Sequence, residues 1–304
     1  MNSITKKLLE TVAGWKGKWE GACSLRENGA CVEMRSTRFV EIAPKEGLSG
    51  LDIHILPGCA GETVAVPACI TDGGIDDLVY NDFHIAAGAR ATIVAGCGIH
   101  TENGEPARHS GIHRFFLGPG AQVRYVEKHA GSGDEALRAI SPETEIYLEE
   151  SAMLEMDTAQ LGGVGRASRS TKAVLAAGAR LFLVERLVTQ GREQAKSSFT
   201  VRLDGAGAAA ELASRAVARE DSRQSFSSRI TGSAPCKGHS ACDALVSERA
   251  QVDAAPSLCA RHAEAALIHE AAIGRIAGEQ ILKLRTLGLS QAEAEQAIIE
   301  GFLS

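Results

Sequence analysis

Hydrophobic and polar residues alternate in short runs along most of the chain after about residue 35. The runs at residues 84–94, 116–126, 146–156 and 174–184 each hold two alternating segments joined by small residues. Alternation with a period of two predicts half-buried β-strands, and the small residues between them predict tight turns. Each run therefore predicts a strand, a turn and a second strand.

The small-residue turns recur at a nearly constant interval. The spacings between Ala89, Ala121, Ala152, Ala179 and Ala208 run from 27 to 32 residues. Such a period is typical of stacked β-coils, because each coil can bury its apolar face only against its neighbours. We therefore expect a mainly β protein, a parallel β-helix over residues 35–277. A long antiparallel sandwich is the alternative, since small-residue turns also suit hairpins.

The N-terminus carries a helical pattern instead. Ile4, Leu8, Val12 and Trp15 fall on one stripe at spacings of four and three residues, which predicts an amphipathic helix. We assign residues 1–34 to an N-terminal helical segment. A helix that caps the fold is favoured, and docking on a membrane surface is the alternative.

The C-terminus is helical again, and residues 278–304 form a third segment. Ser290 followed by Glu293 is a capping box, which predicts the start of a helix that runs to about Phe302. A preceding helix is expected up to Leu287, where a glycine follows and ends it. These helices either cap the open edge of the β-helix or dock a partner.

Composition narrows the range of functions. Of the 304 residues, 44% are hydrophobic and 23% are charged, which excludes wholesale disorder. The net charge of −6 argues against nucleic acid as the main partner. No apolar run approaches the roughly 18 residues that span a membrane, and we find no secretory signal. We therefore expect a cytoplasmic protein whose 8 cysteines are free, metal-bound or reactive.

The common catalytic motifs are missing from the sequence, so the candidate functional residues are its thiols and imidazoles, which cluster in two zones. There is no dinucleotide fingerprint, Walker A motif, G-x-S-x-G, H-E-x-x-H or C-x-x-C. Thiolate and imidazole ligate zinc and iron–sulfur clusters, and buried thiols with surface histidines are the structural alternative. The first zone holds Cys97, His100, His109, His113 and His129. The second zone holds Cys236, His239, Cys242, Asp243, Cys259, His262, His269 and Glu270.

Strand geometry restricts the second zone. If residues 267–271 form a strand, the adjacent His269 and Glu270 point to opposite faces. The two side chains then cannot ligate one ion within one chain unless the strand bulges. One of them would face the interior or a partner.

Five segments near the C-terminus carry a family resemblance. They read A-C-D-A-L-V at 241–246, I-H-E-A-A-I-G-R-I at 268–276, G-E-Q at 278–280, R-T-L-G-L at 285–289 and A-I-I-E-G-F at 297–302. In order and spacing they resemble the motifs of the SufB/SufD family, the scaffold subunits of the SUF machinery for iron–sulfur cluster assembly. The chain is similar to a short, minimal SufB.

The resemblance implies a right-handed parallel β-helix that dimerises near these motifs, as a homodimer or as a heterodimer with a paralogue. It also implies docking of a SufC-type ABC ATPase on the C-terminal helices and delivery of clusters to acceptor proteins. Cys242 matches the cysteine that holds the nascent cluster, and His269 and Glu270 match the family's H-E pair. These three residues are the expected ligands of a transient iron–sulfur cluster. The expected partner-binding residues are Glu279, Gln280, Arg285, Ile298 and Phe302.

The chain also departs from the family pattern. Cys23 and Cys31 are the only N-terminal cysteines where longer members carry a C-x-x-C-type cluster, and Gly274 replaces a serine. The first zone has no counterpart that we can assign, so a route for sulfur and a structural role stay open. Cys236, Cys259, His239 and His262 are secondary ligand candidates.

Two other functions remain to be weighed against the scaffold, which is itself not an enzyme. The first is a SufD-like accessory subunit that dimerises and docks the ATPase without holding a cluster, and Cys242 argues against it. The second is a β-helix enzyme such as a polysaccharide lyase. An aromatic content of 4% disfavours that enzyme, because its cleft would need exposed rings.

Overall fold

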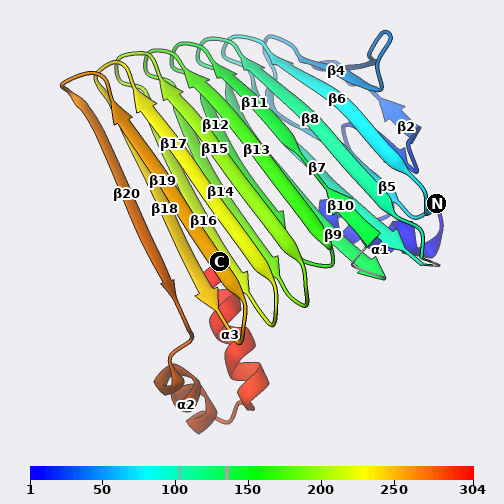
Figure 1. Ribbon diagram of the computed structural model, residues 1–304. Helices are drawn as coiled ribbons and strands as arrows, with labels where there is room; N and C mark the ends of the chain where they lie inside the picture. The colour runs from blue at the N-terminus through cyan, green and yellow to red at the C-terminus, as the bar shows by residue number, and fades with distance from the viewer. Residues whose placement is uncertain (103, 134–136) are drawn as a thin grey trace.

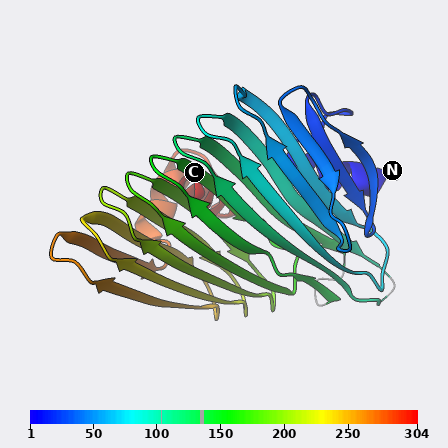
Figure 2. The ribbon, with the colours of Figure 1, turned by 90° about the horizontal axis from the view of Figure 1, so that it is seen from above.

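The fold is a β-solenoid of about 8 turns with three short helices near its ends, in a computed structural model that describes residues 1–102, 104–133 and 137–304 (Figures 1 and 2). Strands make up 59% of it. The predicted parallel solenoid is therefore confirmed, and the antiparallel sandwich is excluded.

Two ten-stranded sheets, here called sheet A and sheet B, form the walls of the solenoid. Successive strands of the chain mostly alternate between the sheets and pair in parallel with the strand one coil away; β1–β2 and β3–β4 at the N-terminal end are antiparallel. Sheet A contains β2 (Ala30–Arg35), β1 (Ala22–Glu27), β5 (Ala60–Ile70), β7 (Arg90–Thr101), β9 (Gln122–Gly133), β12 (Met153–Gln160), β14 (Arg180–Thr189), β16 (Ala209–Ala218), β18 (Cys236–Val246) and β20 (Ala265–Gly274). Sheet B contains β3 (Val40–Pro44), β4 (Gly50–Ile55), β6 (Asp76–Ile85), β8 (Ala107–Leu117), β10 (Arg138–Ile140), β11 (Glu143–Leu148), β13 (Arg166–Leu175), β15 (Gln194–Leu203), β17 (Arg223–Gly232) and β19 (Gln251–Ala260).

The regularly spaced alanines lie at one corner of successive coils, directly before the strands of sheet A. At this corner the amide of Ala121 donates to the carbonyl of Gly118 at 3.0 Å, and the amide of Gly120 donates to Glu150 on the next coil at 2.9 Å. The corners therefore stack by backbone hydrogen bonds, which leaves room only for small side chains. The buried corner alanines are Ala89, Ala121, Ala152, Ala179 and Ala208.

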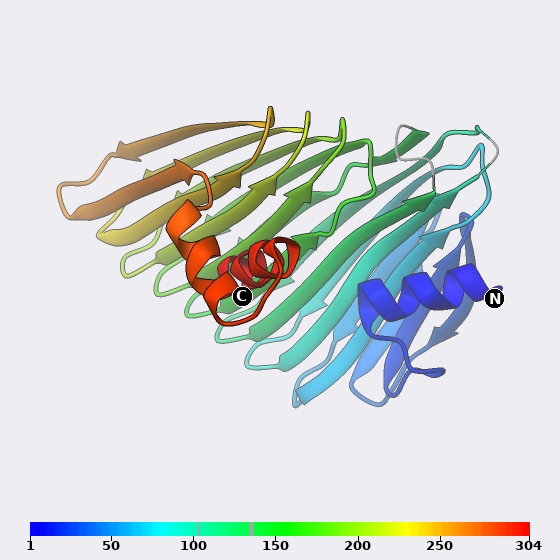
Figure 3. The ribbon, with the colours of Figure 1, turned by 90° about the horizontal axis from the view of Figure 1, so that it is seen from below.

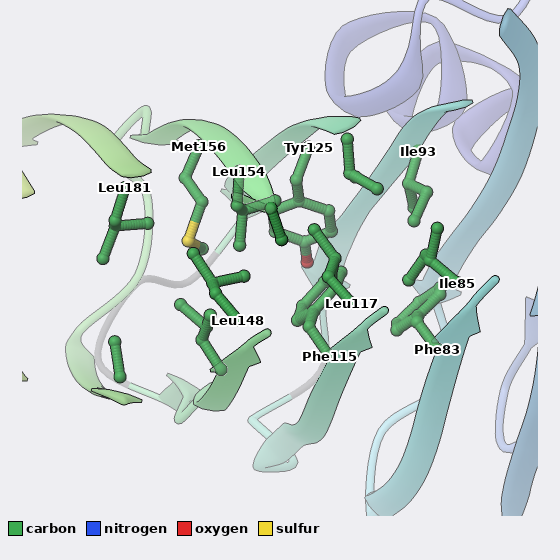
Figure 4. Packing of buried hydrophobic residues seen from close by; sticks show 14 of the residues in the cluster. Phe83, Ile85, Ile93, Phe115, Leu117, Tyr125, Leu148, Leu154, Met156 and Leu181 are labelled. Atoms are coloured by element: carbon green, nitrogen blue, oxygen red, sulfur yellow. The ribbon is translucent and has the colours of Figure 1, made fainter. Parts of the chain in front are cut away.

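The core is a thin apolar layer between the two sheets (Figure 4). The rings of Phe83 and Phe115 stack along sheet B with centroids 4.7 Å apart, and Tyr125 of sheet A meets Phe115 edge-on at 4.9 Å. All three side chains are fully buried. Further along the same core, the rings of Phe199 and Phe226 lie with their centroids 5.6 Å apart, among alanine, valine and leucine side chains.

Helix α1 (Ser3–Ala13) packs on the outer face of sheet A near the N-terminal end (Figure 3). It begins after Asn2, whose side chain accepts from the amide of Thr5, and it ends at Gly14 in the left-handed conformation. Leu8, Leu9 and Val12 are buried against the sheet, so the predicted amphipathic helix is confirmed, and it covers the outer face of sheet A.

The helical part of the N-terminal segment is shorter than the boundary at residue 34 implied. β1 and β2 already lie within residues 1–34, and β1 pairs in parallel with β5. The sheet therefore begins at Ala22. The burial pattern explains why the sequence did not show this: four consecutive residues of β1 are buried, so the alternation with a period of two is lost.

Substitution of Gly98 by alanine tests how closely α1 packs on sheet A. A β-carbon on Gly98 would lie 2.7 Å from the β-carbon of Leu8, so the helix must shift. We expect the free energy of unfolding to fall by about 1–3 kcal/mol, as for other overpacked sites. Urea denaturation measures the change. Gly274→Ala is the matched control in a strand, because no atom lies within 4 Å of the added carbon there; equal effects of the two variants would contradict the expectation.

Helices α2 (Gly278–Thr286) and α3 (Gln291–Leu303) follow the last strand and confirm the predicted C-terminal helices. The capping box of Ser290 and Glu293 is present. α3 returns to the outer face of sheet A, where Arg186 and Arg215 donate to the carbonyls of Leu303 and Ser304 (Figure 3). Among the described residues, every helix is too short or too polar to cross a bilayer.

Candidate functional site

Cys242 lies on β18, one strand before the end of sheet A, and its side chain points into the solenoid. The residue is 0% exposed and belongs to the apolar core. Burial, together with the nearby charges of Asp243 and Glu185, raises the pKa of its thiol to about 11. In the register of the sheet Ala271 of β20 is its neighbour, so the last strand covers Cys242 with a methyl group only.

His269 and Glu270 on β20 point to opposite sides, as the strand periodicity predicted. His269 is paired in register with Ser240 and faces inward, diagonal to Cys242. Both ring nitrogens of His269 are buried and lack a hydrogen-bond partner in the described structure. The side chain of Glu270 is 71% exposed on the outer face, with its Oε2 3.8 Å from Nε2 of His239. The structure therefore places Cys242 and His269 on the inner faces of neighbouring strands and Glu270 on the outer face.

The secondary ligand candidates are dispersed. Cys236 is buried at an inward position of β18. Cys259 is exposed on β19, and His262 lies in the following turn, where its Nδ1 accepts from the amide of Glu264 at 3.1 Å. Of the four candidates, only Cys236 faces the interior of the solenoid with Cys242.

The C-terminal end of the solenoid is open. β19 and β20 are the edge strands of the two sheets, so their inward side chains have no further coil to cover them (Figure 1). Leu258 is 38% exposed and Ile273 is 47% exposed at such positions. Large apolar side chains uncovered at a sheet edge mark an interaction surface.

A buried ion cluster crosses the interior between the sheets. Arg169 of β13 donates to Glu127 Oε2 at 2.7 Å, and its Nε lies 3.5 Å from Glu185 Oε1. Burial alone would raise the pKa of Glu127, but the charges of Arg169 and His129 hold it well below its usual range. For Glu185, burial outweighs the charge of Arg169 and the hydrogen bonds from Ser197 and Ser214, and it raises the pKa.

Sequence reasoning missed this ion cluster, although a signal was present. Glu127 follows Val123 and Tyr125 at the inward spacing of two, and Glu185 follows Leu183 in the same way. A charged residue at an apolar position of a strand is the mark of a paired interior charge.

A column of side chains, one from each successive coil, connects the ion cluster with Cys242. Thr158, Glu185, Ser214 and Cys242 are register partners on β12, β14, β16 and β18. The hydroxyl of Ser214 donates to Glu185 Oε2 at 3.2 Å. Cys242 therefore follows a row of polar side chains that runs through an otherwise apolar core.

A second charged group lies on the N-terminal part of sheet B. Asp52, Asp82 and His84 have side-chain atoms within 4.8 Å of one another, the only such group found in the described part of the chain. Lys45 bonds both carboxylates, and Arg114 donates to Asp82 at 2.6 and 2.7 Å. The positively charged side chains of Lys45 and Arg114 already neutralise these carboxylates, so the group is a salt-bridge network.

Four of the five residues of the first zone line a cavity of about 250 Å³ at the N-terminal end of the solenoid. Cys97 lines it from sheet A, together with His129, and the opposite wall belongs to sheet B. His100 is separate, since its Nδ1 bonds Ser132 at 2.8 Å and its Nε2 lies 3.0 Å from Glu102. His109 and His113 are the sheet B members of the zone that line the cavity.

The expected partner-binding residues divide between the two terminal helices. Glu279, Gln280 and Arg285 are exposed on α2, whereas Ile298 and Phe302 are half-buried on α3. α2 also exposes Leu282 at 60%, and Leu287 after it is 73% exposed. α2 has no buried residue, so it presents an apolar surface that the chain itself leaves uncovered.

Comparison with known proteins decides the family. Residues 76–302 match the family described as "SUF system FeS cluster assembly, SufBD core domain". The chain belongs to the SufBD family. An iron–sulfur cluster assembly SufBD family protein of Archaeoglobus fulgidus is 31% identical over 268 residues, which are 87% of this chain and 71% of that protein. Its counterpart in Methanothermobacter thermautotrophicus, strain Delta H, is 28% identical over 84% of this chain.

This SufBD chain is shorter than its relatives. It covers 63% of the Methanothermobacter protein, less than two thirds, and 74% of a Methanocaldococcus jannaschii member that is 25% identical. The SufBD match spans β6 to α3 and includes Cys242, His269 and both C-terminal helices. Membership confirms the predicted family and supports a role in iron–sulfur cluster assembly.

Proposed function

We propose that this chain is a cluster-assembly scaffold that binds iron and sulfide at Cys242 and works with a SufC-type ABC ATPase. The observation that carries the proposal is the position of Cys242, a buried thiol diagonal to an inward histidine whose ring nitrogens have no partner in the described structure. A buried imidazole without hydrogen bonds is unfavourable unless another group satisfies it. Thiolate and imidazole are ligands of iron.

The open end of the solenoid supports pairing with a second subunit. Cys242 and His269 supply two ligand atoms, and Glu270 of the same strand points away from them. A two-fold interface along β19 and β20 would cover Leu258 and Ile273 and would double the number of ligands. The scaffold therefore works as a homodimer, or as a heterodimer with a paralogue, and passes its cluster to acceptor proteins.

The uncovered surface of α2 supports docking of the ATPase. Leu282 and Leu287 are flanked by Lys283 and Arg285, so the surface combines apolar area with positive charge. An ATPase that moves α2 would also strain the last coil, because α2 directly follows β20. ATP hydrolysis belongs to the partner in this scheme, and the scaffold itself is not an enzyme.

Anaerobic reconstitution with ferrous iron and sulfide tests the role of Cys242. We expect a thiolate-to-iron absorption band in the visible region for the wild type, and its loss or strong weakening in Cys242→Ser. Cys259→Ser is the matched control, because Cys259 is exposed on β19 of sheet B, the next strand of the chain, and does not face the interior. The control should keep the band.

The other outcomes separate the alternatives. A band that Cys242→Ser leaves unchanged would place the cluster on other cysteines and contradict the proposal. The absence of a band in folded wild type, also with the ATPase present, would favour the accessory subunit that docks the ATPase without holding a cluster.

A further inference from the structure

Two histidines of the first zone share one strand and one cavity. His109 and His113 occupy inward positions of β8 on either side of Gly111, and all three line the cavity of about 250 Å³. Both histidines are 6% exposed. A β-carbon on Gly111 would lie 2.5 Å from Nε2 of His113 and 3.7 Å from Nε2 of His109. Both side chains therefore lean toward the same small space above the glycine.

The tautomer of His109 follows from Asp77. Nδ1 of His109 lies 3.2 Å from Asp77 Oδ2, and Arg26 also donates to this carboxylate. Because the carboxylate can only accept, Nδ1 of His109 carries the hydrogen. In the neutral ring, Nε2 then presents a lone pair to the cavity.

The tautomer of His113 follows from Tyr125. The phenol hydrogen of Tyr125 is used in a 2.8 Å bond to Glu127 Oε1. Nδ1 of His113 lies 3.5 Å from the phenol oxygen, so in this long contact the ring nitrogen is the donor. In the neutral ring of His113, Nδ1 then carries the single ring hydrogen. Its Nε2 therefore also presents a lone pair, and the hydrogen bonds of the described residues leave it unused.

His129 differs from these two histidines. Its Nε2 lies 3.5 Å from Glu127 Oε1, and its Nδ1 lies 3.5 Å from Arg169. The carboxylate needs a donor and the guanidinium needs an acceptor, so both ring nitrogens are engaged. His129 belongs to the ion cluster, which leaves two free imidazole nitrogens in the cavity.

We propose that His109 and His113 bind a divalent transition-metal ion through their Nε2 atoms, in the cavity at the N-terminal end of the solenoid. Neutral imidazole held by a carboxylate on its other nitrogen is a common metal ligand, and Asp77 supplies this support to His109. Water fills the remaining coordination positions, which face a cavity that Cys97 also lines. Of this class of ions, ferrous iron is the one that the proposed scaffold consumes, and this part alone rests on the proposed function.

The charges around the cavity and its opening to the surface are compatible with a bound cation. The guanidinium of Arg26 is paired with Asp77, and that of Arg169 with Glu127, so no unpaired positive charge of these two residues faces the site. Met34 and Leu48 line the cavity and are 44% and 55% exposed. The cavity therefore reaches the surface between β2 and the β3–β4 turn.

Titration of the full chain with Co²⁺ tests the site, with ligand-field absorption and calorimetry as readouts. The reference protein is the Cys242→Ser variant, which removes the thiol of the other site. We expect one equivalent of Co²⁺ to bind, and His109→Gln or His113→Gln to lose it. Asp77→Asn should weaken binding by about 10–100-fold, as for other residues that support a metal-binding histidine. Circular dichroism checks that each variant is folded.

His84→Gln is the matched control, since His84 belongs to the salt-bridge network on the outer face. It should leave Co²⁺ binding unchanged. Binding that survives in both His109→Gln and His113→Gln, or that is lost in His84→Gln instead, would overturn the proposal. Cluster formation at Cys242 is measured separately in the otherwise wild-type chain, so failure of one site is distinguishable from failure of the other.

Discussion

Replacement of Arg169 by methionine is expected to lower the free energy of unfolding by about 3–5 kcal/mol, because it removes one partner of a buried ion pair. Arg169 is 8% exposed and lies between two buried carboxylates, with 2.7 Å to Glu127 and 3.5 Å to Glu185. Without the guanidinium, both acids are left in the interior without their cation. Urea denaturation followed by circular dichroism measures the loss.

The pH dependence of the same variant has a definite sign. In the wild type, the lowered pKa of Glu127 contributes stability at neutral pH that is lost as the pH falls through the folded-state pKa. In Arg169→Met, burial raises the pKa of Glu127 instead, so its protonated form is favoured. The difference in the free energy of unfolding between the wild type and Arg169→Met should therefore be larger near pH 8 than near pH 5.

Arg202→Ala is the control for loss of an ion pair at the surface. Arg202 donates to Asp204 at 2.6 Å, but its side chain is 59% exposed. Its loss should cost at most about 1 kcal/mol. A comparable loss in the two variants would contradict the view that the interior cluster stabilises the fold.

The combined substitution Leu258→Asp and Ile273→Asp is expected to abolish self-association. Both residues are at inward positions of the open end, and in a two-fold dimer each substitution appears twice. Four carboxylates in one apolar interface should weaken the dimer by at least about 100-fold, since like charges brought together there cost several kcal/mol. Sedimentation velocity over a range of concentrations measures the dissociation constant.

Leu161→Asp is the matched control for the open end, because Leu161 is 44% exposed on the connection after β12. It should leave association unchanged. A dimer that persists in the double variant would place the interface elsewhere. A wild-type chain that stays monomeric at all concentrations would contradict the homodimer and leave pairing with a paralogue.

The solenoid was predictable because its signals are local. Alternating runs and the corner alanines report on single coils, and each coil repeats the same requirement for small residues where backbones stack. The early start of the sheet was not predictable in this way, because Ala22–Leu25 are all buried and show no alternation. The C-terminal helices were predictable from a capping box and a glycine stop.

The candidate sites were predictable only in part. The segment around Cys242 carries its own sequence signature, and the strand periodicity correctly separated His269 from Glu270. The assembly of Arg169 with Glu127 and Glu185 depends on the register of strands from two sheets, which no local pattern encodes. The same holds for the tautomers of His109 and His113, since their partners come from β6 and β9.

The shallow cover over Cys242 has a consequence for when the thiol can react. In a solenoid each coil is held by its neighbours, and a terminal coil has a neighbour on one side only. β19 and β20 should therefore fray at a lower free-energy cost than the coils before them, and their amides should exchange with solvent first. Cys242 lies directly beneath this coil. Its access to solvent would then depend on a local opening equilibrium, which the proposed second subunit would suppress and the proposed ATPase, acting on α2, would promote.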